Sequence, residues 1–320
     1  MADLPASTAF PRRPFGQTDL YVTPICLGCA QLASMPKIFS EVPETQALDL
    51  LRAAFHSPIN FFDTAAAYGD GESERRIGIA LNELGGLPDN YVLATKADRD
   101  LTSGDFSGEQ TKRSIERSLR LLGVERLQIV YLHDPEHATT TFEQMMEPGG
   151  AVDTLQQYKS QGLIGAIGIA GGPIDLMTRY VQTGAFDAVL THNRYTLLER
   201  SASPLLDIAA SRGMAVLNAA PYSGGMLAKG PDRWPKYAYR EAPPQVIERA
   251  RQIDQICQQY SVPLAAAALQ FSLHDPRITS TIVGMAHAER LAQTIDLALY
   301  PIPDELWAQL EAISGQVGSL

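Results

Sequence analysis

The sequence predicts an α/β protein in which eight parallel strands close into a barrel, and three observations lead to this prediction. Eight short runs rich in valine and isoleucine have the composition of strands that are buried on both faces. Helical patterns separate these runs, with about 30–40 residues in each unit, as parallel strands with helical crossovers require. Titratable residues lie at the ends of three runs, and the carboxyl ends of barrel strands converge on one pocket. The predicted fold is therefore a (β/α)8 TIM barrel with this pocket at its C-terminal mouth.

The chain is expected to begin with a β-hairpin. Phe15 and Gly16 precede a Gln-Thr-Asp turn between two short strands within residues 11–27, and this hairpin would close one end of the barrel. The barrel strands are then expected at residues 25–28, 60–62, 91–95, 127–132, 165–170, 188–191, 214–218 and 279–283.

Helices are expected between these strands. Residues 72–84 place their apolar side chains on one helix face, and residues 110–122 repeat this pattern. The second of these helices should end at Gly123, since glycine suits the left-handed position after a helix. Other helices are expected to start near Pro43, Ala151 and Ser203, and residues 262–273 should form a buried helix.

One segment departs from this alternation. Residues 221–244 are rich in proline, glycine and tyrosine, and they are longer than an ordinary connection. Long loops in compact domains are usually lids or binding loops. We therefore expect a barrel whose mouth carries long functional loops.

A doubly wound dinucleotide-binding fold is the alternative architecture. It requires a Gly-x-Gly-x-x-Gly turn after the first strand. Residues 27–32 read Leu-Gly-Cys-Ala-Gln-Leu, so the sequence disfavours it. The chain is expected to be one barrel domain over residues 1–320, with a disordered tail over residues 1–10.

Composition excludes several classes of function. The net charge is −10 and no block is rich in lysine or arginine, which argues against nucleic acid or an anionic membrane as a partner. No apolar run approaches the ~20 residues of a membrane-spanning helix. The first residues have no secretory leader pattern, so a cytoplasmic protein is expected.

Three cysteines, Cys26, Cys29 and Cys257, cannot form a disulfide framework. Cys26 and Cys29 form a C-x-x-C pair, but Cys26 lies inside an apolar run instead of at the start of a helix. No second pair of cysteines or histidines supports a metal site, so no metal is predicted. We expect two small buried residues near a cofactor.

Four polar residues, Asp63, Tyr68, Lys96 and His133, carry the predicted chemistry. Three of them lie at the ends of predicted strands, and Tyr68 lies within reach of the same pocket. A nearby ammonium lowers the pKa of a tyrosine from its ordinary value near ~10. Lys96, held by Asp63, is therefore expected to make Tyr68 the proton donor or acceptor. His133 is expected to position the reacting oxygen, and both Tyr68 and His133 should contact the substrate.

In this order, the four residues resemble the catalytic tetrad of the aldo-keto reductase superfamily. The resemblance extends from Phe15-Gly16 to Ile282-Val283-Gly284 and includes the segments at 61–69, 72–74, 118–123 and 162–164. Residues 169–173, 193–198 and 218–225 are most similar to aldose 1-dehydrogenases of the D-threo-aldose, L-fucose and L-galactose type. The resemblance implies that the anomeric carbon of a sugar is oxidised to a lactone, with NAD or NADP accepting the hydride.

The resemblance also implies a set of cofactor contacts. The expected residues are Gly28, Cys29, His192, Pro221, Tyr222, Gly224, Gly284, Ala286, Arg290 and Thr294. The Ser-Asn pair that holds the nicotinamide amide in many relatives is replaced by Ala170-Gly171. Ala286 replaces an arginine that reads the 2′-phosphate of NADP, which favours NAD slightly. Arg290 stands where other relatives place such an arginine.

Three other functions remain open. An NADPH-dependent reductase of aldehydes or ketones would use the same tetrad in the opposite direction. A Schiff-base aldolase would use Lys96 as its nucleophile, although Asp63 would keep that amine charged. A nicotinamide-sensing barrel without catalysis would need a partner-binding feature, and the sequence suggests none.

The partner is expected to be a small-molecule sugar or carbonyl substrate, chosen by the loops at residues 31–42, 135–141 and 234–239. Aromatic side chains in these loops suit stacking on a sugar ring, and Trp234 is the expected substrate contact. The aromatic residues concerned are Phe39, Trp234, Tyr237 and Tyr239.

Overall fold

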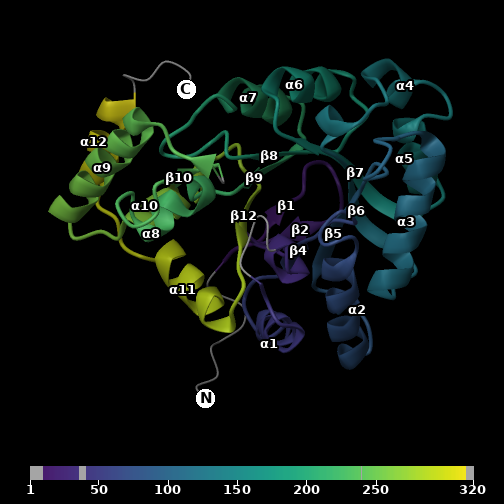
Figure 1. Ribbon diagram of the computed structural model, residues 1–320, viewed down its shortest axis with the longest axis horizontal. Coiled ribbons are helices and arrows are strands. Elements are labelled where there is room, and N and C mark those ends of the chain that lie inside the picture. The colour runs from purple at the N-terminus through teal and green to yellow at the C-terminus, as the bar shows by residue number, and fades with distance from the viewer. Residues whose placement is uncertain (1–9, 36–40, 239, 315–320) are drawn as a thin grey trace.

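The computed structural model describes residues 10–35, 41–238 and 240–314, and it contains a closed barrel of eight parallel strands (Figure 1). The strands follow one another around the barrel in chain order, and β12 pairs with β3 to close it. Every predicted strand is confirmed, with boundaries within two residues of those observed. The strands are β3 (Ile25–Gly28), β4 (Phe61–Asp63), β5 (Val92–Ala97), β6 (Leu127–His133), β7 (Ile164–Gly171), β8 (Ala188–His192), β9 (Ala215–Ala219) and β12 (Ser280–Gly284).

The predicted hairpin is confirmed as β1 (Arg13–Pro14) and β2 (Tyr21–Val22), which pair in antiparallel fashion. Phe15 is fully buried, and its ring meets Phe61 edge-on with 6.1 Å between centroids. Gly16 has a φ of 58°, and a Cβ there would lie 2.8 Å from the backbone nitrogen of Ala215, the first residue of β9. The hairpin therefore closes the amino end of the barrel, opposite the mouth. The tail expected at residues 1–10 lies outside the described residues except for residue 10, and so do the aromatics Phe39 and Tyr239.

Helices surround the barrel and bury their apolar faces against it (Figure 1). The predicted helix at 72–84 is α2, and Gly123 ends α3 with a φ of 67°, as expected. Ser107 caps the start of α3 by accepting a hydrogen bond from the Gln110 amide. The helices are α1 (Glu44–Ala54), α2 (Glu72–Leu84), α3 (Gly108–Leu122), α4 (Phe142–Met146), α5 (Ala151–Ser160), α6 (Ile174–Gln182), α7 (Ser203–Ser211), α8 (Met226–Lys229), α9 (Pro244–Gln259), α10 (Leu264–Leu273), α11 (Ala288–Ala298) and α12 (Asp304–Ser314), with 3-10 turns η1 (Ala30–Ala33), η2 (Pro135–His137) and η3 (Ser223–Gly225).

The interior of the barrel has its own apolar cluster, separate from the layer between strands and helices. Tyr131 is the largest side chain in this interior, and Gly168 on the neighbouring strand makes room for its ring. A Cβ at Gly168 would lie 2.3 Å from that ring, so only glycine fits there. All three cysteines are buried and free, as expected. The filled interior leaves the mouth as the place where side chains can meet a ligand.

The segment at residues 221–244 is more ordered than a long loop. It contains η3, α8 and a hairpin of β10 (Lys236–Tyr237) and β11 (Arg240–Glu241). Met226 and Leu227 are fully buried in a cluster with α9 and α10, which fixes the segment to the barrel. The glycine and proline content of this segment suggested a loop, because composition alone does not show that a few of its apolar residues are buried. Within the described ranges, every helix is too short or too polar to cross a bilayer.

Candidate active site

Three neighbouring strands bring the predicted residues together by simple alternation. Side chains on a strand alternate between its two faces, so every second residue lines the barrel interior. Phe61, Ala94 and Tyr131 belong to the interior cluster. The next inward positions along β4, β5 and β6 are therefore Asp63, Lys96 and His133. These side chains lie just above the apolar filling of the barrel, at its C-terminal mouth.

Lys96 is the centre of the hydrogen-bond network. Its Nζ donates to Asp63 Oδ1 at 2.5 Å, to the Thr64 carbonyl at 2.7 Å and to Tyr68 Oη at 3.3 Å. The side chains of Lys96 and Asp63 are 1% and 4% exposed. An ammonium has three N–H groups, and all three have acceptors here. Lys96 is therefore held in one orientation beneath the phenol.

The charge of Lys96 follows from these contacts. Burial alone would lower the pKa of Lys96, but the Asp63 carboxylate and the Tyr68 phenol raise it above its ordinary value. The amine stays protonated, which a Schiff-base nucleophile cannot do. The geometry therefore disfavours the aldolase alternative.

The pKa of Tyr68 differs from the expectation. Desolvation raises the pKa of Tyr68 above that of a free phenol, and the nearby Lys96 ammonium only partly opposes this. The prediction that the pKa of Tyr68 is lowered is therefore wrong for the protein alone, because the loss of water around the phenol has a larger effect on the pKa than one nearby cation. Tyr68 is thus a neutral phenol, ready to donate its proton. Its ring also lies edge-on to His133, with 5.9 Å between centroids.

His133 has a partner that the sequence prediction missed. Its Nδ1 lies 2.6 Å from Asp98 Oδ1, and Asp98 Oδ2 accepts the Ala67 amide at 2.7 Å. Asp98 is 4% exposed and follows Lys96 by two positions, so it is the next inward residue at the end of β5. The same alternation that predicts the tetrad could have identified it.

The carboxylate of Asp98 fixes the proton on His133. A carboxylate only accepts, so the Nδ1 atom of His133 must carry the hydrogen. Burial lowers the pKa of His133, but Asp98 and Asp134 outweigh it and raise the pKa above its ordinary value. Only the protonated imidazolium can then donate from Nε2, the atom that faces away from Asp98 and lies 3.6 Å from Asp134 Oδ2. Below this raised pKa, His133 therefore carries a hydrogen on Nε2 that is available to donate.

The first group of predicted cofactor residues lies at the closure of the barrel. Gly28 and Gly284 are paired at the ends of β3 and β12, and a Cβ at Gly28 would approach the Gly284 nitrogen at 3.3 Å. Cys29 is fully buried, and its amide donates to the Asp63 carbonyl at 2.8 Å. Its contribution is to hold the strand end that carries Asp63. Thr294 is also buried, on α11.

The second group of predicted cofactor residues contains or adjoins buried polar atoms that lack a hydrogen-bond partner among the described residues. Among the described residues, the Tyr222 hydroxyl and the Asn193 amide oxygen are buried without a hydrogen-bond partner. Asn193 directly follows His192, whose pKa burial lowers, so that its imidazole is neutral. Next to Tyr222, the backbone of Ser223 and Gly224 has positive φ angles of 51° and 73°. A dinucleotide with its amide and phosphate groups could satisfy these atoms, so the residues fit a nicotinamide cofactor.

Basic side chains gather at one edge of this region. A cavity of about 370 Å³ is lined by Lys229, Arg233, Arg290, Ala228 and Trp234. Three cations on one cavity in a chain of net charge −10 indicate a site for an anion.

Two further residues were predicted to contact the cofactor, Pro221 and Ala286. Pro221 lies in the turn before η3, and the Ala286 carbonyl accepts a hydrogen bond from Gln46 at 2.7 Å.

Trp234 lines this basic cavity. Its Nε1 donates to the Gly224 carbonyl at 3.0 Å, and Lys229 Nζ lies 3.5 Å from its ring centroid. In the described part of the chain its contacts thus join it to the predicted cofactor residues. Its predicted role in substrate binding remains a prediction.

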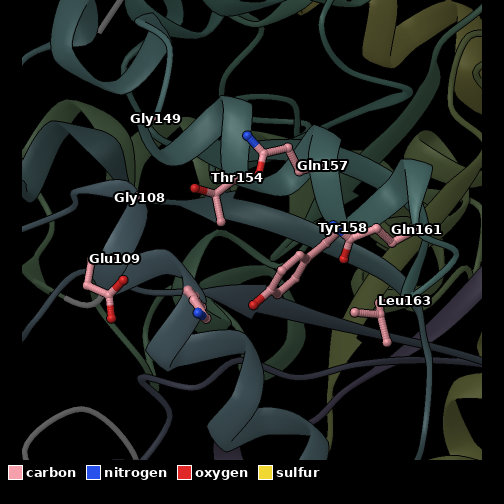
Figure 2. A pocket seen from close by; sticks show the side chains of 9 residues that line it. Gly108, Glu109, Gly149, Thr154, Gln157, Tyr158, Gln161 and Leu163 are labelled. Atoms are coloured by element: carbon pink, nitrogen blue, oxygen red, sulfur yellow. The ribbon is translucent and has the colours of Figure 1, made fainter.

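A larger cavity, of about 600 Å³, lies on the outside of the barrel between α3 and α5 (Figure 2). Its lining includes Glu109, Lys112 and Tyr158, and it contains none of the predicted site residues. The described ranges also contain no group of three or more histidine, cysteine, aspartate or glutamate side chains placed to hold a metal ion. The chemistry is therefore best sought at the mouth.

Comparisons with known proteins agree with this geometry. The sequence model of the Aldo/keto reductase family matches residues 24–314. D-threo-aldose 1-dehydrogenase of a Pseudomonas species is 32% identical, over 87% of this chain and 91% of its own length. L-galactose dehydrogenase of Arabidopsis thaliana is 31% identical, over 96% and 95%. An aldo-keto reductase from Bacillus halodurans, solved in its holo form, superposes with a TM-score of 0.78 at 20% identity, over 95% and 96% of the two chains, and supports the fold.

Proposed function

The chain belongs to the aldo/keto reductase family, and from this premise we propose that it oxidises the anomeric carbon of an aldose to a lactone. As a member of this family it is an NAD(P)-dependent oxidoreductase that acts on small carbonyl or sugar molecules. The contact of Lys96 with both Asp63 and Tyr68 carries the proposal, because it places a proton-transfer phenol at the mouth. The likeness to D-threo-aldose 1-dehydrogenase and L-galactose dehydrogenase supports a sugar as the substrate.

Tyr68 and His133 have separate roles in the proposed reaction. Tyr68, as the phenolate that remains once its own proton has left to solvent, takes the proton of the anomeric hydroxyl while the hydrogen on the same carbon leaves with its electron pair, and the lactone carbonyl forms. The oxidised nicotinamide, when bound, accepts this hydride. The Lys96 ammonium partly opposes the raised pKa of Tyr68 and so stabilises the phenolate that this step requires. His133 Nε2 positions the reacting oxygen.

The groups expected to hold the cofactor come from four loops. Gly28 and Gly284 are paired at the ends of β3 and β12, and Tyr222 offers a buried hydroxyl that has no hydrogen-bond partner among the described residues. His192 and Asn193 offer a neutral imidazole and an amide oxygen to the nicotinamide amide, in place of the Ser-Asn pair.

The proposal is tested by initial rates of coenzyme reduction with a panel of aldoses. Rapid reduction with L-fucose, L-galactose or a D-threo sugar, together with the corresponding lactone as product, would support it. If no sugar gives coenzyme reduction, but simple aldehydes oxidise the reduced coenzyme, the reductase alternative would replace this proposal. That alternative uses the same residues, and the charged donor at His133 Nε2 favours it, since a carbonyl oxygen needs a donor.

One observation favours NAD as the coenzyme and another favours NADP. The alanine at position 286 removes an arginine for the 2′-phosphate, which favours NAD. The cavity formed by Arg290, Lys229 and Arg233 supplies three cations for a phosphate, which favours NADP. We propose that both coenzymes bind and that Arg290 makes the difference in affinity between them.

Replacing Arg290 tests this directly. Arg290→Ala is expected to raise the KM for NADP⁺ by about tenfold and that for NAD⁺ by about twofold or less, because only NADP⁺ carries the phosphate. Arg113→Ala removes an exposed arginine on α3 and serves as the matched control. Equal changes with both coenzymes would show that Arg290 does not read the 2′-phosphate.

Asp98 gives a prediction for the dependence on pH. The raised pKa of His133 means that the imidazolium prevails below that pKa and is lost as the pH rises through it. The rate of carbonyl reduction should therefore fall on the alkaline side with this pKa. Asp98→Asn removes the carboxylate charge that raises the pKa of His133, so this limb should move to lower pH.

The measurement is kcat/KM against pH for the wild type and for Asp98→Asn, with titration of His133 by NMR as an independent readout. Asp100→Asn is the matched control, since Asp100 is a partly exposed carboxylate in the same segment. An unchanged profile in Asp98→Asn would mean that His133 does not donate as an imidazolium.

A further inference from the structure

Asp134 is a carboxylate at the mouth whose purpose the tetrad does not explain. It directly follows His133, and its side chain is 26% exposed. Asp134 Oδ2 lies 3.6 Å from His133 Nε2, which is too far for a hydrogen bond. Throughout the described ranges, no hydrogen bond to the Asp134 carboxylate is formed. A carboxylate with free acceptor positions therefore stands beside the group that positions the reacting oxygen.

The backbone of Asp134 is strained in order to hold it there. Its φ of 45° and ψ of 54° are left-handed, and Pro135 follows it. A non-glycine residue rarely adopts this conformation, and the residue before a proline prefers an extended one. The Asp134 amide donates to the Ala170 carbonyl at 2.8 Å, and the His137 amide donates to the Asp134 carbonyl at 3.0 Å. Strain that the surrounding structure maintains is typical of functional positions.

The charges around Asp134 show what kind of group it can bind. Desolvation would raise the pKa of Asp134, but nearby positive charge, that of His133 first, outweighs it and keeps the pKa below its ordinary value. The carboxylate is therefore ionised, and its charge is already opposed by neighbouring positive groups. A further cation has little to gain there, whereas a neutral O–H group can donate to a free oxygen.

The distances place that O–H group on the substrate. The reacting oxygen accepts from His133 Nε2, so it lies about one hydrogen-bond length, near ~2.8 Å, from that atom. Asp134 Oδ2 lies 3.6 Å from the same atom. A hydroxyl on the carbon next to the reacting carbon lies close enough to the reacting oxygen to reach Asp134 at the same time.

We propose that Asp134 is a specificity-determining residue that accepts a hydrogen bond from a hydroxyl on the carbon adjacent to the reacting carbon. The enzyme then selects polyhydroxylated substrates over simple aldehydes of similar size. This inference rests on the proposed function for the identity of the sugar, but it applies to either direction of the reaction.

The test compares glyceraldehyde with propanal, which has the same carbon chain without hydroxyls, in the direction of reduction. The wild type should favour glyceraldehyde in kcat/KM. Asp134→Leu should lower kcat/KM for glyceraldehyde by about 10- to 100-fold and that for propanal clearly less, the smaller loss reflecting the contribution of the Asp134 charge to the raised pKa of His133. Asp134→Asn, which tolerates the left-handed backbone and keeps one acceptor oxygen, should lie between the two.

Three outcomes would overturn the proposal. They are a wild type without preference for glyceraldehyde, a preference that Asp134→Asn and Asp134→Leu leave unchanged, and an equal loss with both substrates, which would indicate a structural role. The oxidation of aldoses is measured separately on the wild type. A wild type that discriminates through Asp134 but oxidises no sugar would contradict the proposed function and leave this inference standing.

Discussion

Tyr68→Phe is expected to lower kcat by about 10²–10⁴-fold, the usual contribution of a positioned acid or base, while the affinity for coenzyme stays within about twofold. The phenol is the only tetrad oxygen that both contacts Lys96 and lies in a partly exposed position at the mouth. Its removal leaves the shape of the site intact, because phenylalanine keeps the ring against His133. The loss should therefore appear in turnover alone.

The measurement is a pair of readouts on one variant: steady-state rates and coenzyme affinity by fluorescence titration. Tyr21→Phe is the matched control, since Tyr21 is 56% exposed on the hairpin at the opposite end of the barrel. If Tyr68→Phe loses coenzyme binding together with turnover, the residue supports the structure of the site and its assigned role is wrong.

Lys96→Met is expected to lower the free energy of unfolding by about 3–5 kcal/mol and to abolish activity. Lys96 and Asp63 form a buried ion pair, and removing one partner leaves an uncompensated charge in the barrel. Asp63 Oδ2 has no hydrogen-bond partner among the described residues, so Lys96 supplies the main stabilisation of the Asp63 charge. Adding Asp63→Asn to Lys96→Met should restore much of the stability and none of the activity.

Urea unfolding of the single and double variants measures this difference. Lys159→Met is the matched control, because Lys159 pairs with Asp187 at 2.6 Å but is 37% exposed. Its loss should cost about 1 kcal/mol or less. Equal destabilisation by Lys96→Met and Lys159→Met would show that the tetrad pair is no more dependent on its partner than a surface pair.

Much of this site could be predicted from the sequence because a barrel imposes its own geometry. Asp63, Lys96 and His133 each end a strand, and parallel strands bring their ends to one mouth. Asp98 was missed because the segment after Lys96 reads as a charged loop, although it continues the inward alternation of β5. Its pairing with His133 depends on the register of β5 against β6, with Ala97 opposite Leu132, and no local pattern sets that register.

Other features of the site could not be predicted because they depend on solvent exclusion and on contacts between distant segments, which a sequence does not show. The pKa of Tyr68 depends on how far water is excluded around the phenol, and this exclusion outweighs the charge of Lys96. The basic cavity joins Arg290 on α11 to Lys229 on α8, which lie far apart in the chain. Trp234 was predicted as a substrate contact because aromatic side chains suit stacking on a sugar ring, and this stays a prediction; its contacts with Gly224 and Lys229 emerge only from the folded segment.

The transfer of deuterium from the anomeric carbon tests the central claim most directly. An aldose deuterated at C1 is incubated with oxidised coenzyme, and both products are analysed by mass spectrometry. We predict that the reduced coenzyme carries one deuterium, that the lactone carries none, and that Tyr68→Phe suppresses the transfer. Lactone that forms without label in the coenzyme, or no oxidation of any aldose, would contradict hydride transfer from the anomeric carbon at this site.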